Sequence, residues 1–237
     1  MMNEPFTCIG KGHGAPAIPA TREAWEALRN EPWLADMCRR IAHGDEWLKP
    51  KLPVWTPICA GFQNNHRAVA DALKPLNRLM LDFDEKGHSA EILEKSLQLQ
   101  EEGKWEILLV EESVRRGTHV LIVLPEGMEV QEAQVRFSDD VGFQADPALK
   151  DVARCIYMVP ASHTLYVNEA LFEVTPHLNA IFRTESSTTR QSEAKNLGNI
   201  AQQNVDAPEI LRRKAPLDDS TKCLTSFCHS ERSEESR

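Results

Sequence analysis

Hydrophobic positions between residues 78 and 159 change from strand-like to helical spacing and back, which predicts alternating strands and helices. Apolar runs predict strands at 78–84, 105–110, 117–124 and 153–159, and helical spacing predicts helices at 89–103 and 130–137. The order is therefore strand, helix, strand, strand, helix, strand. This order predicts an α+β fold with one mixed sheet in a split βαβ arrangement, similar to an RNA-recognition motif (RRM-like).

Residues 21–44 precede this core and have the spacing of two helices. Thr21 can cap the first helix, Pro32 suits the first turn of the second, and Gly44 lies just past its end. Further upstream, the glycine-rich stretch at 10–14 lacks the Gly-Lys-Ser/Thr ending of a phosphate loop and its flanking strand and helix. We therefore expect residues 1–20 to form a flexible arm.

One folded domain is expected to span residues 21–183. Residues 184–208 are rich in Ser, Thr, Gln, Asn and Glu and have almost no aromatic residue, which is typical of a linker that cannot bury enough surface to fold. The last residues of the chain look like translated repetitive DNA. We therefore interpret 184–237 as a disordered linker with a non-native tail, and we expect that a module which followed the domain is missing.

The chain has a net charge of −9, and nearly all of the excess acid lies within residues 1–183. This acidity disfavours a general polyanion-binding surface, so contact with nucleic acid should use a local groove and a metal ion. No apolar run approaches the length of a membrane span, and the N-terminus lacks the features of a signal peptide. The six cysteines have no zinc-site spacing. These features predict a cytoplasmic protein with reduced thiols and no membrane partner.

Two carboxylates, Asp82 and Asp84, close the apolar run at 79–84. Residues at i and i+2 of a strand share a face, so both carboxylates should project together while Leu81 and Phe83 pack behind them. Such a pair can hold Mg²⁺ or Mn²⁺ and leave coordination sites for phosphate oxygens. The alternative is a strand that simply ends in a solvated turn.

Further polar candidates lie later in the chain. His119 opens an apolar strand directly after Arg115-Arg116-Gly117-Thr118, and the imidazole and the two arginines can meet a triphosphate. Asp146 lies in a predicted loop from which its carboxylate can return to the metal, and Arg154 opens the predicted last strand, where it can hold phosphate. Each also has a plain structural explanation, as a core histidine, a turn aspartate or an ion-paired arginine.

In their order and spacing, these residues resemble the catalytic core of archaeo-eukaryotic-type primases and primase-polymerases. More narrowly, the chain is similar to the primase-like N-terminal domain that precedes virulence-associated-protein-E-type helicases in mobile genetic elements. The resemblance covers residues from about 55 to 173 and is carried by Ala60–Phe62, Leu79–Asp84, Arg116–His119, Asp146, Asp151–Tyr157 and Tyr166–Phe172.

This resemblance implies a nucleotidyltransferase of DNA replication that acts on nucleoside triphosphates along a single-stranded DNA template. In that family the paired aspartates and a third acid bind two divalent ions, which makes Asp82, Asp84 and Asp146 the implied catalytic metal ligands. The family histidine contacts the phosphates of the incoming nucleotide, and His119 takes that place here. Two positions before the histidine the family often has a small hydroxyl residue, where this chain has Gly117. The helicase module is the implied missing partner.

Two other functions stay open. A catalytically silent domain that handles DNA or acts as an adaptor would keep the fold without turnover. A metal-dependent phosphohydrolase, similar to haloacid-dehalogenase-like enzymes, would use Asp82 as nucleophile and Asp84 as acid on a doubly wound sheet. That class needs a Thr or Val shortly after the second aspartate, where this chain has Glu85, so we rank it lowest.

Overall fold

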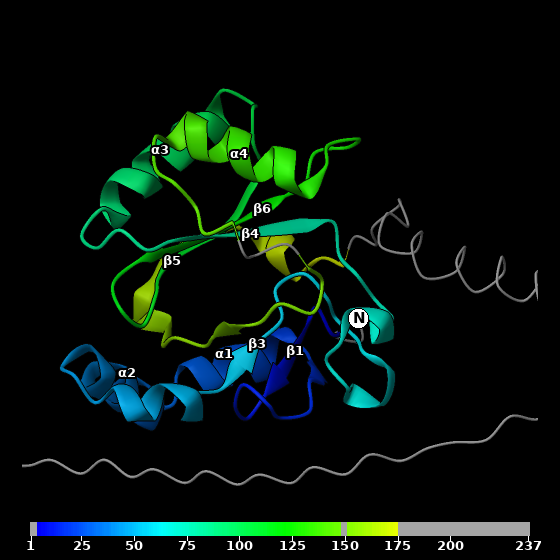
Figure 1. The fold of residues 1–237 in the computed structure, drawn as a ribbon, viewed down its shortest axis with the longest axis vertical. Helices are drawn as coiled ribbons and strands as arrows, with labels where there is room; N and C mark the ends of the chain where they lie inside the picture. The colour runs from blue at the N-terminus through cyan, green and yellow to red at the C-terminus, as the bar shows by residue number, and fades with distance from the viewer. Residues whose placement is uncertain (1–3, 148–150, 175–237) are drawn as a thin grey trace, which may run out of the picture. The chain divides into compact units, whose positions relative to one another are not determined.

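The computed structural model describes residues 4–147 and 151–174 of the chain. In these ranges the chain has an α+β fold with two four-stranded antiparallel sheets (Figure 1). The first sheet has the strand order β2-β1-β3-β7, with β1 (Thr7–Gly10), β2 (Ile18–Ala20), β3 (Val54–Trp55) and β7 (Ile156–Tyr157). The second has the order β4-β6-β5-β8, with β4 (Arg78–Phe83), β5 (Ile107–Glu112), β6 (Thr118–Val123) and β8 (Thr164–Val167).

Four α-helices and several short 3₁₀ helices connect the strands in the described ranges. The α-helices are α1 (Arg22–Arg29), α2 (Pro32–Ala42), α3 (Ser89–Glu101) and α4 (Val130–Val141). The 3₁₀ helices are η1 (Glu46–Lys51), η2 (Gln63–Asn65), η3 (Val69–Asp71), η4 (Ala161–His163) and η5 (Glu169–Phe172).

The second sheet contains the split βαβ passage that the sequence predicts. The chain runs from β4 through α3 to β5, and β6 then inserts between these two strands. Helices α3 and α4 cover one face of the sheet (Figure 1), where Leu81, Phe83, Val120 and Phe137 belong to one buried cluster. The alternate residue Met80 belongs to the other main cluster, which includes residues of α1 and α2. The two faces of β4 therefore pack against different layers.

The predicted mixed sheet is wrong, because every strand pair in the second sheet is antiparallel. The predicted last strand at 153–159 is also wrong. Only Ile156–Tyr157 is a strand there, and it pairs with β3 of the first sheet. The second sheet is completed instead by β8, whose alternating burial places Tyr166 within hydrogen-bond distance of Gln100 on α3 at 3.0 Å. Pro160, which has no N–H, separates the two short strands.

The predicted flexible arm at residues 1–20 is wrong for the described residues 4–20. Strand β1 pairs with β2 on one side and with β3 on the other. Phe6 and Cys8 are fully buried, and the Phe6 ring meets the Trp25 ring edge-on at a centroid distance of 5.8 Å. The glycines at 12 and 14 lie in the connection between the two strands. These glycines do lie in a turn, but the short strands on either side of this turn were not recognised in the sequence.

The predicted start and end signals of the first two helices are confirmed. The Thr21 hydroxyl accepts a hydrogen bond from the Ala24 backbone N–H, Pro32 begins α2, and Gly44 follows its end with a φ of +112°. Helices α1 and α2 lie on the opposite side of the second sheet from α3 and α4 (Figure 1). Asp82 therefore projects from β4 into the space between the sheet and the N-terminal layer.

The predicted domain end at residue 183 and the predicted linker and tail at 184–237 lie outside the described residues. No helix in the described ranges is long and apolar enough to cross a lipid bilayer.

Candidate functional site

Asp82 and His119 meet because β4 and β6 are hydrogen-bonded neighbours. The two residues are directly opposite each other in the antiparallel register, and the His119 Nε2 atom lies 3.7 Å from the Asp82 Oδ1 atom. Asp84 follows the end of the same strand, one residue beyond Phe83. The pairing of Asp82 with a histidine 37 positions away thus follows from the insertion of β6 beside β4.

These three side chains share one pocket of about 180 Å³. The two carboxylates, Asp82 and Asp84, form its acidic part. The basic groups that line it are Lys49, Arg115, His119 and Arg154, and Tyr157 contributes an aromatic wall. Because acids and bases face one small space, the pocket suits a ligand that combines a cation with oxyanions, such as a metal-bound phosphate.

A buried ion pair between Arg29 and Glu111, which the sequence did not reveal, holds the His119 ring through a hydrogen bond. The His119 Nδ1–H donates to the Glu111 carboxylate at 3.2 Å, and Arg29 Nη2 of α1 donates to the same carboxylate at 2.8 Å. Glu111 is fully buried, and only 3% of the Arg29 surface is exposed. In the register of the sheet, Glu111 lies opposite both His119 on β6 and Thr164 on β8. A polar row therefore crosses all four strands.

The charges of this row balance when His119 is protonated. Burial lowers the pKa of the His119 imidazole, but the hydrogen bond to Glu111 and the charges of Asp82 and Glu111 outweigh it, so that the pKa is raised overall. Burial also raises the pKa of Asp82, helped by Asp84 and Asp146 and opposed by His119. Arg29 and the imidazolium then compensate Glu111 and Asp82. The structure thus favours a cationic His119 in the pocket wall.

We expect the free energy of unfolding to fall as the pH rises above about 6.5, the ordinary pKa of histidine. A raised folded-state pKa stabilises the protein fully below the unfolded value, and this contribution is lost as the pH rises through the folded value. The raised pKa of Asp82 acts with the same sign, but its contribution begins to be lost above the ordinary carboxyl pKa of 3.8. Urea unfolding between pH 6 and 9 measures the slope, and His119→Gln should flatten it. Equal slopes for wild type and variant would contradict the charged histidine.

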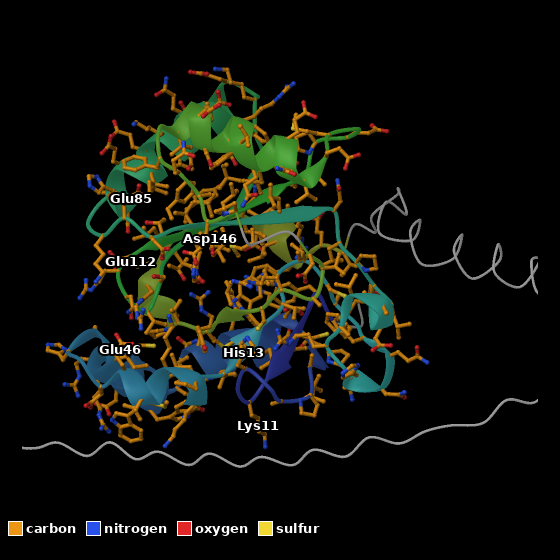
Figure 2. The ribbon with its side chains drawn as sticks, viewed as in Figure 1. Lys11, His13, Glu46, Glu85, Glu112 and Asp146 are labelled. Carbon is orange, nitrogen blue, oxygen red and sulfur yellow. The ribbon has the colours of Figure 1, made fainter. Side chains whose placement is uncertain are left out.

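Asp146 lies beside β4 at the edge that β6 leaves free (Figure 2). Its backbone N–H donates to the Asp82 carbonyl at 2.8 Å, and Gln134 Nε2 of α4 donates to the Asp146 carbonyl at 2.6 Å. The Asp146 side chain is not part of the pocket lining. Its charge nevertheless contributes to the raised pKa of Asp82. The third predicted acid is therefore a neighbour of the pair, held by its backbone.

Within residues 4–147 and 151–174, no three His, Cys, Asp or Glu side chains are grouped closely enough to hold a metal ion between them. The structure therefore does not bring Asp82, Asp84 and Asp146 together as the predicted three-acid metal site, and only Asp82 and Asp84 share the pocket.

The hairpin between β5 and β6 places Arg115 in the pocket wall, whereas Arg116, the arginine assigned to nucleotide binding, does not line the pocket. Arg116 has a left-handed backbone with φ of +71°, and its largely exposed side chain lies 3.5 Å from Glu112. Arg115 forms an ion pair with Glu46 of η1. Arg154 also lines the pocket, from the turn that precedes β7, and its predicted contact with phosphate stays a prediction. The left-handed backbone of Arg116 turns the chain, so Arg115 faces the pocket while Arg116 faces solvent.

Lys49 was not predicted, and it enters the pocket from η1. Its Nζ atom lies 5.2 Å from the centre of the Tyr157 ring. Burial lowers the pKa of Lys49, with the charge of Arg115 in support, while Glu46, Asp82 and Asp84 oppose the shift. No local pattern marks Lys49 or Arg29 as functional. Glu111 could have been recognised in the sequence as unusual, because it is an acid that directly continues an apolar strand.

No protein-family model, curated protein or solved structure matches the chain. Its function must therefore be inferred from the geometry and chemistry of the site.

Gly117 is required by packing between the hairpin and the end of β4. A Cβ atom at this position would lie 2.5 Å from the Phe83 carbonyl oxygen and 3.4 Å from the Asp84 Cα atom. The Gly117 carbonyl also accepts a hydrogen bond from the Ser113 backbone N–H at 2.8 Å. A hydroxyl residue here would thus push β4 and the hairpin apart, next to both carboxylates.

We expect Gly117→Ala to lower the free energy of unfolding by about 1–3 kcal/mol, since the added Cβ atom meets backbone that cannot move aside cheaply. Urea unfolding checks the value. Gly14→Ala is the matched control, because a Cβ atom there meets nothing within 4 Å, and its effect should stay within about 0.5 kcal/mol. Similar values for the two variants would contradict the close approach.

Proposed function

We propose that this chain is a primase-polymerase-like nucleotidyltransferase domain that acts on nucleoside triphosphates and a DNA template with Mg²⁺ or Mn²⁺. The observation that carries the proposal is the shared pocket of Asp82, Asp84 and His119 with three further basic side chains. The antiparallel sheets disfavour the phosphohydrolase alternative, which needs a doubly wound parallel sheet.

The donor set fits a divalent ion. Mg²⁺ is commonly held by one or two carboxylates together with substrate phosphates and water, so Asp82 and Asp84 are sufficient protein ligands. The raised pKa of Asp82, caused by burial and by the neighbouring acids, indicates negative charge that a bound cation would relieve. When bound, such an ion neutralises phosphate charge and favours ionisation of an attacking 3′-hydroxyl.

The remaining residues supply phosphate binding and orientation. Lys49, Arg115 and Arg154 present cationic donors to the pocket. The Glu111 carboxylate accepts the His119 Nδ1–H, which directs Nε2 toward Asp82 and the pocket. The protonated His119 can then donate a hydrogen bond from its Nε2–H to a phosphate oxygen without changing its own position. The buried partner thus prepares the imidazole before any substrate arrives.

Thermal unfolding with added Mn²⁺ and nucleoside triphosphate tests binding, and synthesis of labelled primers on single-stranded DNA tests turnover. We expect a higher melting temperature with both ligands together than with either alone, and primer products that require the metal. Absence of both responses would contradict the proposal.

A second candidate is a domain that binds nucleotide or DNA without turnover. The specific observation in its favour is that the Asp146 side chain does not line the pocket that holds Asp82 and Asp84. Stabilisation by metal and nucleotide without any primer product would favour this second function over the first.

A further inference from the structure

The pocket that contains Asp82 and Asp84 is small for a complete nucleotide. Its volume is about 180 Å³. Pockets that enclose a small organic ligand usually measure about 300–1,000 Å³ and are lined mainly by apolar and aromatic side chains. Charged side chains line most of this pocket instead. Its size and lining therefore suit a short and highly charged group.

Two cations of the pocket are available to oxyanions. Lys49 and Arg154 form no ion pair among the described residues, whereas Arg115 is paired with Glu46. Lys49 enters from η1 and Arg154 from the turn before β7, while the two carboxylates come from the end of β4 in the second sheet. A chain of phosphates that meets both cations can thus share a divalent ion with the carboxylates.

The same pocket has almost no surface for a nucleobase. Proteins hold unpaired bases chiefly by stacking them on aromatic rings. Tyr157 is the only aromatic wall besides the His119 imidazole, and the Lys49 Nζ atom already lies over its ring at 5.2 Å from the centre. The apolar side chains Val114 and Ile156 are only 3% and 5% exposed.

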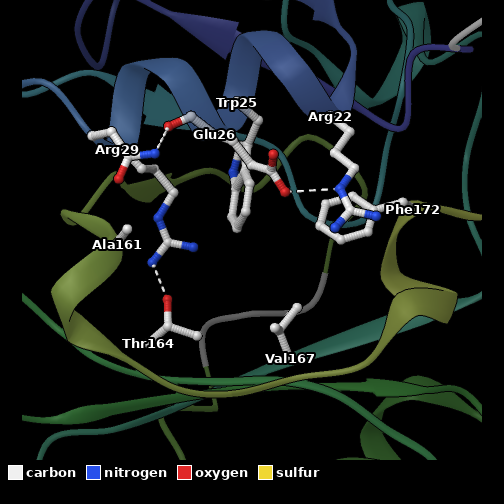
Figure 3. Close-up of a pocket in the computed structure, with 9 residues that line it drawn as sticks. Arg22, Trp25, Glu26, Arg29, Ala161, Thr164, Val167 and Phe172 are labelled. Atoms are coloured by element: carbon white, nitrogen blue, oxygen red, sulfur yellow. Dashed lines mark hydrogen bonds and ion pairs between the residues drawn. The ribbon is translucent and has the colours of Figure 1, made fainter.

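The larger hollow of about 280 Å³ between α1 and the segment with β8 and η5 is no alternative place for a base (Figure 3). The Arg29 Cζ atom lies over the Trp25 ring at 4.2 Å from its centre, and the Arg22 Cζ atom lies over the Phe172 ring at 4.0 Å. Only 4% of the Trp25 surface is exposed. The arginines of this hollow therefore already occupy the ring faces that a base would need.

We propose that the pocket of Asp82 and Asp84 selects a metal-bound polyphosphate chain and leaves the nucleoside outside, so that affinity does not depend on the base. This inference rests on the proposed function, because it assigns which part of the triphosphate substrate the site binds. Lys49 and Arg154 meet phosphate oxygens, and a divalent ion joins the phosphates to the two carboxylates. A base that is chosen by a template strand needs no pocket of its own.

Calorimetric titrations with preformed Mn²⁺ complexes of tripolyphosphate, ATP and CTP test this inference, with adenosine as the fourth probe. We expect the dissociation constants of the three polyphosphate ligands to agree within about threefold, and adenosine to show no binding. Without Mn²⁺, tripolyphosphate should bind at least about tenfold more weakly, because Asp82 and Asp84 then repel it.

Two variants from different elements show whether the contacts are to phosphate. Lys49→Met and Arg154→Gln should each weaken all three polyphosphate ligands equally, by about tenfold, because each removes a charged hydrogen-bond donor. Lys51→Met is the matched control, since Lys51 is an exposed lysine of the same short helix that does not line the pocket. It should leave all affinities unchanged. Urea unfolding confirms that each variant is folded.

The results separate this inference from the proposed function. ATP binding at least about tenfold tighter than tripolyphosphate or CTP would overturn the inference, while the nucleotidyltransferase proposal would stand. The same holds if Lys49→Met weakened the nucleotides but not tripolyphosphate. Absence of binding by all three polyphosphate ligands would overturn both.

Discussion

Glu111→Gln is expected to lower the free energy of unfolding by about 3–5 kcal/mol, because it breaks a buried ion pair and leaves one partner charged. Glutamine has nearly the same shape, but it leaves the Arg29 guanidinium buried without a counter-charge. It also removes one of the two carboxylates that favour a protonated His119. Urea unfolding at pH 7 measures the loss.

Glu112→Gln is the matched control for this substitution. Glu112 is the next residue of β5, and its only described ion pair is with the largely exposed Arg116, so the effect should stay within about 0.5 kcal/mol. The double variant Arg29→Met, Glu111→Leu should recover much of the lost stability, because no unpaired charge remains. A loss of less than about 1 kcal/mol in Glu111→Gln would show that the ion pair is not a structural requirement.

Asp82→Asn is expected to weaken binding of Mn²⁺ with nucleoside triphosphate by at least about 100-fold, since removal of a ligand costs no less than removal of its supporting partner. The same substitution should raise the free energy of unfolding without ligand at pH 8. Burial and the charges of Asp84 and Asp146 make the ionised Asp82 carboxylate unfavourable in the folded protein. Asparagine is neutral, so the variant does not carry this cost. Calorimetric titration and urea unfolding measure the two effects.

Asp36→Asn serves as the control, because Asp36 is an exposed acid of α2 that pairs with Arg39. It should leave both ligand affinity and stability nearly unchanged. If Asp82→Asn bound the metal and nucleotide as tightly as Asp36→Asn does, the carboxylate pair would not be the metal site. Opposite changes in stability and binding are typical of residues that are retained for function.

The sequence was a good guide to those site residues that lie on strands. Asp82 and His119 lie at the ends of apolar runs. Because side chains alternate between the two faces of a strand, the buried positions of each run show to which face these polar side chains project. Their direct pairing required the additional fact that β6 inserts between β4 and β5. The order of predicted elements pointed to this insertion through the split βαβ pattern.

Residues that reach the site from other layers could not be predicted. Arg29 lies 82 positions before Glu111, and nothing in α1 distinguishes it from a solvated arginine. Which of the two arginines lines the pocket depends on one residue with a left-handed backbone in the hairpin. The spacing of hydrophobic residues does not reveal such a residue. Asp146 was placed in the correct region, but its side-chain direction depends on loop backbone contacts.

The errors in the fold have a common physical origin. Strands of two to four residues, such as β1, β3 and β7, are too short to show a period. They are stable here because each pairs with a neighbour and packs on a shared core, and not because of local preference. The predictions of a flexible arm and of a last strand at 153–159 were both wrong at such short strands.

The ion pair between Arg29 and Glu111 also decides how this protein can be divided. A fragment that starts after α1 would contain the whole of the second sheet, yet its central acid would have lost its only described cationic partner apart from the imidazole. The smallest autonomous folding unit must therefore include α1 together with β4–β6. Split halves cut within residues 43–77 should remain unfolded alone and regain structure only when mixed.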